Sequence, residues 1–222
     1  MPITIVIAED QRLFRQSLRL LLEHERDLVV VGEAMDGRQA FDLAVAHKPG
    51  IVLMDVDMPR LDGITATRLI RSCVPDSKVL MLSVHDDDAR IVAAVQAGAC
   101  GYILKDADHQ EFLRIIRATF EGDVVRSPFM PDGFAKKAMA LVNKQGESEG
   151  GGLSLLTERE HEILACAAAG RSNKEIADRL SISPETARTH VNRILGKLHV
   201  ASRVQATLYA LRTGIASIDE AE

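Results

Sequence analysis

The sequence lacks the features of an exported, disulfide-bonded or membrane-inserted protein. It contains only three cysteines, Cys73, Cys100 and Cys166, which are far apart and form no CxxC pattern. Structural disulfides and zinc sites are therefore not expected. No apolar run approaches the roughly 20 residues that a membrane-spanning helix needs. The first residues carry no basic lead and no small-residue cleavage site, so we expect no signal peptide and a cytoplasmic protein.

The sequence also lacks an overall excess of positive charge. Its formal net charge is −5, which argues against a protein that coats nucleic acid without selectivity. Residues 155–222 hold nine basic and nine acidic residues, so the excess negative charge lies in residues 1–154. Within residues 171–203, seven basic residues accompany three acidic ones. This modest basic patch is compatible with binding to a phosphate backbone.

Residues 1–120 contain short apolar runs that alternate with amphipathic segments. The runs are Ile3–Ile7, Leu28–Glu33, Ile51–Met54, Lys78–Leu82 and Gly101–Leu104. They are apolar at successive positions, which is typical of parallel strands that are covered on both faces. The segments between them show helical periodicity. We therefore predict an α/β domain with a doubly wound, five-stranded parallel sheet.

Residues 121–154 interrupt this alternation. A possible helix at Phe134–Val142 is followed by residues 143–152, which are rich in glycine and charge and have no apolar periodicity. Such a composition favours a flexible linker. We therefore divide the chain into a first domain at 1–120, a linker with a possible helix at 121–154, and a second domain at 155–222.

The second domain is predicted to be a small all-α domain of four helices, because helix start and stop signals punctuate it clearly. Capping boxes begin at Thr157, Ser172 and Ser202, Ser183 precedes a proline at the first helical position, and Gly170 and Gly214 are stop signals. The predicted helices are 157–169, 173–180, 184–199 and 202–213.

Polar side chains follow the predicted strands of the first domain. Glu9 and Asp10 follow the first strand, Asp55 the third, Ser83 the fourth and Lys105 the fifth. In a doubly wound sheet, ligands bind beyond the carboxyl ends of the strands, so these residues should meet at one edge. Each of them alone is more often a loop residue, a helix cap or a solvated charge. Their combination indicates a functional site.

These residue types suit phosphoryl chemistry. Clustered carboxylates repel one another unless a hard cation neutralises them, and Mg²⁺ prefers carboxylate, carbonyl and water oxygens. A carboxylate oxygen can attack phosphorus and give an acyl phosphate. The metal and a lysine then offset the charge on the phosphoryl oxygens. The sequence therefore predicts a magnesium-dependent phosphate-accepting site.

Residues 1–120 resemble the receiver domain of two-component response regulators, which has a flavodoxin-like fold. The resemblance rests on Glu9-Asp10, on Asp55-Val56-Asp57-Met58-Pro59, on Ser83 and on Gly101-Tyr102-Ile103-Leu104-Lys105. It implies these roles: Asp55 as phosphoacceptor, Glu9 and Asp10 as the acidic pocket, Asp10 and Asp55 as direct Mg²⁺ ligands, Asp57 as a ligand through its backbone carbonyl, Ser83 as switch hydroxyl, Tyr102 as switch aromatic and Lys105 as the phosphoryl-binding lysine.

Helices 173–180 and 184–199 are separated by the three-residue turn Ser181-Ile182-Ser183, a length that suits a helix-turn-helix motif. The second helix has one apolar face and one polar face. Arginine, asparagine and threonine on a polar face suit guanine, adenine and thymine edges respectively. Such a face on an isolated helix is more often only solvated surface.

Residues 155–214 closely resemble the LuxR/NarL-type helix-turn-helix, through the segments 156–160, 170–177 and 183–191. The resemblance implies base-reading roles for Arg188, Thr189 and Asn192. It implies phosphate contacts for Asn173, Lys174, Thr186, Arg193 and Lys197. The apolar face of the last helix, Val204, Leu208 and Leu211, is either core or dimer surface, and the family favours a dimer contact.

Together the two resemblances point to the NarL/FixJ class of response regulators. They imply a phosphorylation-dependent transcription regulator, not an enzyme, that receives a phosphoryl group on Asp55 from a sensor histidine kinase. Phosphorylation would modulate dimerisation and binding of the homodimer to paired half-sites in double-stranded promoter DNA. Two alternatives stay open: a phosphatase or hydrolase that turns over a small phosphorylated substrate, and a receiver that acts only by protein contact.

Overall fold

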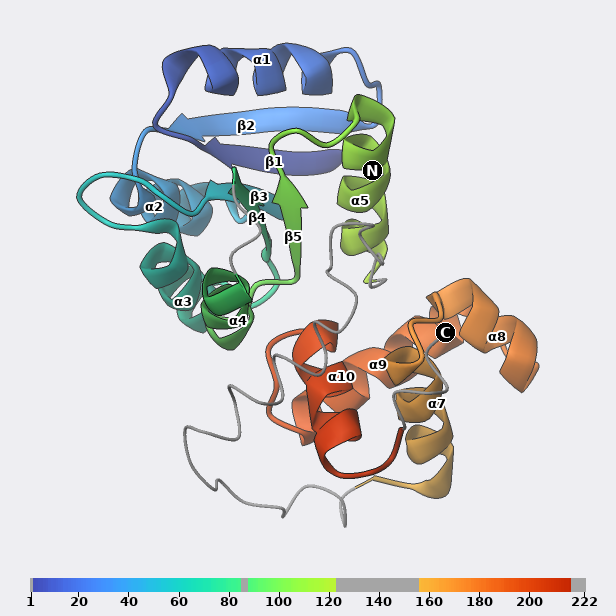
Figure 1. Ribbon diagram of the computed structural model, residues 1–222. Coiled ribbons are helices and arrows are strands. Elements are labelled where there is room, and N and C mark those ends of the chain that lie inside the picture. The colour runs from blue at the N-terminus through green and yellow to red at the C-terminus, as the bar shows by residue number, and fades with distance from the viewer. Residues whose placement is uncertain (1, 85–87, 123–155, 217–222) are drawn as a thin grey trace. The chain divides into compact units, whose positions relative to one another are not determined.

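The computed structural model describes residues 2–84, 88–122 and 156–216 (Figure 1). Contacts divide the chain into two compact units, Met1–Phe120 and Glu121–Glu222. The possible helix at Phe134–Val142 and most of the predicted linker lie outside the described residues. Among the helices of the described part, none is long and apolar enough to cross a membrane.

The first unit contains the predicted five-stranded, all-parallel sheet. Its strands are β1 (Ile3–Ala8), β2 (Leu28–Ala34), β3 (Ile51–Asp55), β4 (Lys78–Ser83) and β5 (Gly101–Leu104), in the order β2-β1-β3-β4-β5. Four strands extend one residue beyond the predicted ends, because their last residues still pair with a neighbour. Asp55, for example, pairs with Leu82, and Ser83 pairs with Leu104.

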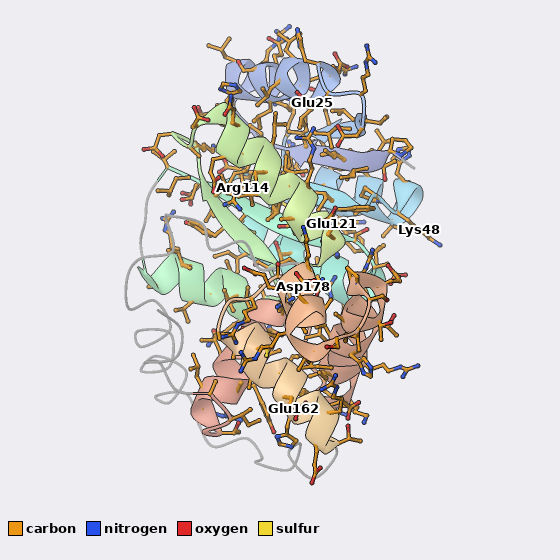
Figure 2. The ribbon with its side chains drawn as sticks, turned by 90° about the vertical axis from the view of Figure 1, so that its right-hand side faces the viewer. Glu25, Lys48, Arg114, Glu121, Glu162 and Asp178 are labelled. Carbon is orange, nitrogen blue, oxygen red and sulfur yellow. The ribbon has the colours of Figure 1, made fainter. Side chains whose placement is uncertain are left out.

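Helices cover both faces of this sheet, as a doubly wound fold requires. They are α1 (Arg12–Glu23), α2 (Gly37–His47), α3 (Gly63–Cys73), α4 (Asp88–Gln96) and α5 (His109–Glu121). Figure 1 shows α1 and α5 on one face and α2, α3 and α4 on the other. The central strands are buried as a consequence, and Ile5, Leu53 and Leu80 are fully inaccessible. Charged side chains such as Lys48 and Arg114 point outward (Figure 2).

The start of α3 is packed tightly against the end of β3. Asp62 caps the helix, since its side chain accepts a 2.8 Å hydrogen bond from the Thr65 amide. The Gly63 amide donates to the Val56 carbonyl at 3.0 Å. A Cβ atom at Gly63 would lie only 1.9 Å from the Asp55 carbonyl oxygen. By sequence alone an ordinary turn glycine would serve there equally well, but the structure leaves no room for a side chain.

The described part of the second unit consists of the four predicted helices, α7 (Glu158–Ala168), α8 (Asn173–Leu180), α9 (Pro184–Lys197) and α10 (Arg203–Arg212). They enclose an apolar core that includes Ile163, Ile176 and Ile194. Charged side chains such as Glu162 and Asp178 point away from it (Figure 2). The unit is therefore a small all-α domain with its own core.

Most of the predicted helix start and stop signals of this unit are confirmed. Both halves of the capping box form at Thr157 and at Ser172, and Gly170 and Gly214 have positive φ angles just after α7 and α10. The third box forms only in part: Ser202 accepts from the Gln205 amide, but the Gln205 side chain accepts from the preceding Ala201 amide.

The end of α9 differs from the prediction. The helix ends at Lys197 rather than at residue 199. Leu198 is its C-cap, and His199 adopts a left-handed conformation with φ of 53°. A left-handed residue at this position is a common way for a helix to end.

Replacement of Gly63 by alanine is expected to destabilise the first unit by about 1–3 kcal/mol, because the new methyl group meets backbone rather than a flexible side chain. Gly196 in α9 is the matched control, since its Cβ position has no atom within 4 Å. Gly196→Ala should stabilise its helix by up to about 1 kcal/mol. Urea denaturation followed by NMR signals of each unit measures both effects. An unchanged stability for Gly63→Ala would contradict the close packing.

Candidate functional site

Three carboxylates meet at the carboxyl edge of the sheet, as the sequence predicts. Glu9 and Asp10 follow β1, and Asp55 is the last residue of β3. One oxygen from each of the three lies within 4.8 Å of the others. Glu9 and Asp55 are buried, with 0% and 3% exposure, whereas Asp10 is exposed. The cluster lies where the strand order reverses between β1 and β3, which is the usual ligand site of this fold.

Lys105 completes this pocket from the loop after β5. Its Nζ lies 2.7 Å from Glu9 Oε2 and 3.1 Å from Asp55 Oδ1. It also lies 4.9 Å from the centre of the Phe14 ring, a distance that suits a cation–π contact. The Lys105 amide donates to the Ser83 carbonyl at 2.8 Å. The lysine is thus held both by its backbone and by its charged end.

The electrostatics of the pocket leave negative charge uncompensated. Burial and the neighbouring Glu9 carboxylate raise the pKa of Asp55 to about 6, although Lys105 opposes the shift. Burial disfavours the charge of Lys105, but its bonds to Glu9 and Asp55 outweigh this effect and raise the pKa of the lysine. The ammonium group of Lys105 thus contacts two carboxylates, Glu9 and Asp55, of a cluster of three. Such a site favours a further cation.

The other residues predicted for this site lie in different surroundings. Ser83, the last residue of β4, is buried, and Tyr102 in β5 is buried as well. The Asp57 carboxylate is exposed and forms an ion pair with Arg90 of α4. The predicted metal contact of Asp57 through its backbone carbonyl stays a prediction.

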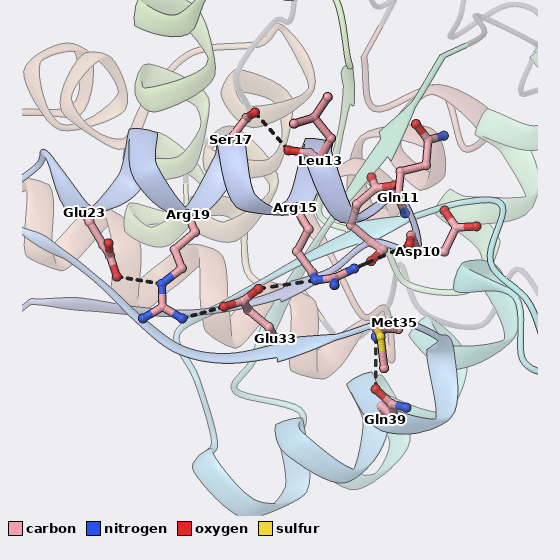
Figure 3. Close-up of polar contacts among 11 residues, drawn as sticks. Asp10, Gln11, Leu13, Arg15, Ser17, Arg19, Glu23, Glu33, Met35 and Gln39 are labelled. Atoms are coloured by element: carbon pink, nitrogen blue, oxygen red, sulfur yellow. Dashed lines mark hydrogen bonds and ion pairs between the residues drawn. The ribbon is translucent and has the colours of Figure 1, made fainter.

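Arg15 is a neighbour of the acidic pocket that the sequence analysis did not single out. Its Nη1 donates to the Glu9 carbonyl oxygen at 2.6 Å, and its Nε lies 3.3 Å from Glu33 Oε2 (Figure 3). It lies on the buried face of α1 together with Leu18 and Leu22. An arginine at an apolar helical position was the signal in the sequence that could have revealed it.

The loop after Asp55 also contacts the start of α2. The Gly37 amide donates to the Leu61 carbonyl at 3.0 Å, and Arg60 forms an ion pair with the buried Asp36. A Cβ atom at Gly37 would lie 2.5 Å from the Leu61 carbonyl oxygen. The start of α2 therefore restrains the loop that carries Asp57.

In the second unit, α8 and α9 form the predicted helix-turn-helix. Ser181 ends α8 in a left-handed conformation, and Ser183 caps α9 by accepting from the Thr186 amide at 3.1 Å. On α9, Thr186, Thr189, Asn192 and Arg193 are exposed, and Arg188 is half-buried. Ala187, Val191 and Ile194 are buried on the opposite face. A polar face is thus available on the second helix.

The residues predicted to contact phosphates fall into two groups. Lys174, Thr186 and Arg193 are exposed. Lys197 instead places its Nζ 2.6 Å from Glu160 Oε2, and the Asn173 side-chain carbonyl accepts from Arg203 at 3.0 Å. These two side chains therefore have contacts within the domain.

Glu160 was recognised in the sequence only as part of a capping box. Its side chain is buried and accepts from the Thr157 amide at 2.8 Å. The hydrogen bond from Lys197 and those from Thr157 hold the pKa of Glu160 below its usual value. The glutamate therefore joins the start of α7 to the end of α9.

The predicted dimer residues lie on α10. Leu211 belongs to the apolar core of the domain, Val204 is buried and Leu208 is half-buried. Leu211 therefore has a role in domain packing. A dimer contact of these three residues stays a prediction.

Two families match the chain. Residues 5–117 match the response regulator receiver domain, and residues 154–210 match the luxR family of bacterial regulatory proteins. The chain belongs to the response-regulator family. This response regulator combines a receiver with a LuxR-type DNA-binding domain and is a transcription regulator of the two-component type.

Known proteins resemble this response regulator over nearly its whole length. The transcriptional regulatory protein DegU of Brevibacillus brevis is 35% identical over 222 residues, which cover 96% of this chain and 94% of DegU. LiaR of Bacillus subtilis is 37% identical over 210 residues, which cover 95% of this chain and 97% of LiaR.

Solved structures agree with the fold. The signal receiver domain of the response regulator NarL from Mycobacterium tuberculosis is 35% identical, with a TM-score of 0.53, over 55% of this chain and 98% of that domain. The response regulator ChrA of a heme-sensing two-component system is 34% identical, with a TM-score of 0.51, over 96% of this chain and 98% of ChrA.

Replacement of Asp55 by asparagine is expected to stabilise the metal-free protein at pH 7.5 by about 1–2 kcal/mol, because the ionised Asp55 carboxylate is buried and lies beside the Glu9 carboxylate. A raised pKa means that the wild-type carboxyl adds stability below about pH 4, its ordinary pKa, and loses it as the pH rises through about 6. The advantage of Asp55→Asn should therefore shrink as the pH falls from 6 to 4. Urea unfolding with a metal chelator measures it, and an advantage that grows toward low pH would refute the assignment.

Replacement of Lys197 by methionine is expected to lower the free energy of unfolding of the second unit by about 1–2 kcal/mol, because Glu160 then loses its cation. Lys174→Met is the matched control, since Lys174 is exposed. It should leave stability within about 0.5 kcal/mol of the wild type. Urea denaturation followed by NMR signals of this unit compares the two variants. Equal stabilities would show that the Lys197–Glu160 pair contributes nothing.

Proposed function

We propose that Asp55 of this response regulator accepts a phosphoryl group from a sensor histidine kinase, and that this event modulates dimerisation and promoter binding. The observation that carries the proposal is the position of Lys105 Nζ, 3.1 Å from Asp55 and 2.7 Å from Glu9, beside the three clustered carboxylates. In the transfer, the bond between phosphorus and a kinase histidine nitrogen breaks. A bond between phosphorus and an Asp55 oxygen forms.

Mg²⁺ is the metal that the pocket fits best. Its donors are carboxylate oxygens, with no sulfur or imidazole among Glu9, Asp10 and Asp55. Burial and the nearby Glu9 carboxylate raise the pKa of Asp55 to about 6, so ionised Asp55 would gain from a further positive charge beside it. Asp10 and Asp55 would hold the metal directly, Glu9 would complete the acidic pocket, and Asp57 would add its carbonyl. When bound, the metal would neutralise charge on the phosphoryl oxygens.

The residues around Asp55 have defined tasks in this proposal. With a pKa of about 6, Asp55 is mostly ionised at neutral pH and can act as a nucleophile. Lys105 would bind a phosphoryl oxygen, and the Ser83 hydroxyl would bind another. Tyr102 would repack as the switch aromatic. The product is one stable protein phosphate rather than a released product, so the chain acts as a regulator and not as an enzyme.

The second domain supplies the output. In the proposal, residues 1–120 are the receiver, 121–154 the linker and 155–222 the DNA-binding domain. Arg188, Thr189 and Asn192 of α9 would read base edges, and the phosphate contacts would come from Asn173, Lys174, Thr186, Arg193 and Lys197.

The DNA-bound form is proposed to be a homodimer. Two domains joined through Val204, Leu208 and Leu211 of α10 would bind paired half-sites in double-stranded DNA. The second half-site then gains from a high effective concentration. Phosphorylation would thus raise the affinity for DNA without changing the contacts that each domain makes to its half-site.

The test compares the wild type with Asp55→Ala, each with and without Mg²⁺ and a small-molecule phosphodonor. Oligomeric size is measured by gel filtration and DNA binding by fluorescence anisotropy. Only the wild type with both Mg²⁺ and the phosphodonor should dimerise and gain about tenfold or more in DNA affinity. Equal DNA binding by both proteins under all conditions would refute the phosphorylation switch. Steady release of phosphate would favour a hydrolase.

A further inference from the structure

We propose that Arg15 is a positioning residue for the acidic pocket: it holds the backbone of the Glu9–Asp10 pair so that the two carboxylates face the cation. The inference rests on the proposed Mg²⁺ site. It adds a residue that contacts neither the metal nor the phosphoryl group. Figure 3 shows the guanidinium of Arg15 between the turn that carries this pair and Glu33 of β2.

The contacts of Arg15 are directed at the main chain of the acidic pair. Its Nη1 lies 2.6 Å from the Glu9 carbonyl oxygen and 3.5 Å from the Asp10 carbonyl oxygen. No ion pair between Arg15 and a carboxylate of the pocket occurs among the described residues. Arg15 therefore determines the path of the backbone rather than the charge balance of the pocket.

The turn after β1 is held at further points. The Glu9 amide donates to the Ala34 carbonyl at 3.0 Å, which continues the ladder to β2. The Gln11 amide donates to Glu9 Oε1 at 3.0 Å and orients that carboxylate. Arg15 bonds to the carbonyl between these two amides. With the backbone fixed on both sides, Glu9 and Asp10 can remain close to Asp55 despite their repulsion.

The geometry of Arg15 is itself fixed from β2. Its side chain is only 10% exposed, and Glu33 Oε2 lies 3.3 Å from its Nε. Glu33 also pairs with Arg19, one turn further along α1, and Arg19 pairs with Glu23. A planar guanidinium can bond to a carbonyl on one side and to a carboxylate on the other, whereas a lysine ammonium is a single point charge.

A comparison of Arg15 with Arg19 distinguishes two roles: positioning of the Glu9–Asp10 backbone, and attachment of α1 to β2. Both arginines attach α1 to β2 through Glu33. Only Arg15 also contacts the Glu9–Asp10 backbone in the described structure. If Arg15 served only to attach the helix, replacement of either arginine would affect the pocket similarly.

The experiment compares Arg15→Met with Arg19→Met in the full chain, since methionine keeps most of the apolar stem. The Mg²⁺ dissociation constant is measured by titration calorimetry. Exchange of the Gln11 amide hydrogen is measured by NMR without metal. Arg15→Met should weaken Mg²⁺ binding by about tenfold, the range found for residues that orient metal ligands, and should accelerate Gln11 exchange. Arg19→Met should leave both quantities within about twofold of the wild type.

The second variant, Arg15→Lys, keeps the positive charge and tests whether the guanidinium is required. It should weaken Mg²⁺ binding by several-fold, less than Arg15→Met, because one ammonium cannot bridge Glu9 and Glu33 as the guanidinium does. The inference would be overturned if both Arg15 variants bound Mg²⁺ with the affinity of the wild type and exchanged the Gln11 amide hydrogen at the wild-type rate, even if their stability fell. Equal losses in Arg15→Met and Arg19→Met would also overturn it. A wild type that binds no Mg²⁺ would refute the proposed function instead, while Gln11 exchange would still decide the role of Arg15.

Discussion

The first unit must hold three mutually repelling carboxylates close together at one edge of its buried sheet. Glu9, Asp10 and Asp55 bring their oxygens within 4.8 Å of one another, and Lys105 is the cation among them in the described structure. Without a cation or a fixed backbone, carboxylates this close together, two of them buried, would move apart or become protonated. They stay together because the ends of β1 and β3 are neighbours in the sheet, and because the loops beyond those ends are restrained.

Those restraints involve mainly backbone groups. Gly63 allows α3 to begin in direct contact with the Asp55 carbonyl. Gly37 allows the start of α2 to donate a hydrogen bond to the loop that follows β3. Arg15 bonds to the Glu9 carbonyl from α1. Three helices therefore hold the turns that present the acidic groups. Fixed backbone is what permits a site to keep charges close before its ligand binds.

The sequence predicts what local patterns determine. Strands β1 to β5, the two complete capping boxes and the meeting of Glu9, Asp55 and Lys105 follow from periodicity and from the geometry of a parallel sheet. The sequence does not reveal contacts between distant residues. Glu160 and Lys197 are 37 positions apart, and their ion pair depends on how α7 packs on α9. The clash that requires Gly63 depends on tertiary packing as well.

Two buried carboxylates of this chain show how environment separates a structural charge from a reactive one. Glu160 accepts hydrogen bonds from Thr157 and Lys197, so its pKa lies below the usual value. Burial and the neighbouring Glu9 carboxylate raise the pKa of Asp55 to about 6, and Lys105, which Asp55 shares with Glu9, offsets only part of the shift. The first carboxylate is satisfied by the protein alone and needs no ligand. The Asp55 carboxylate is not satisfied in this way, because Lys105 offsets only part of the effect of burial and of Glu9. A further positive charge would stabilise it, which suits the receiver pocket to a metal ion and a phosphoryl group.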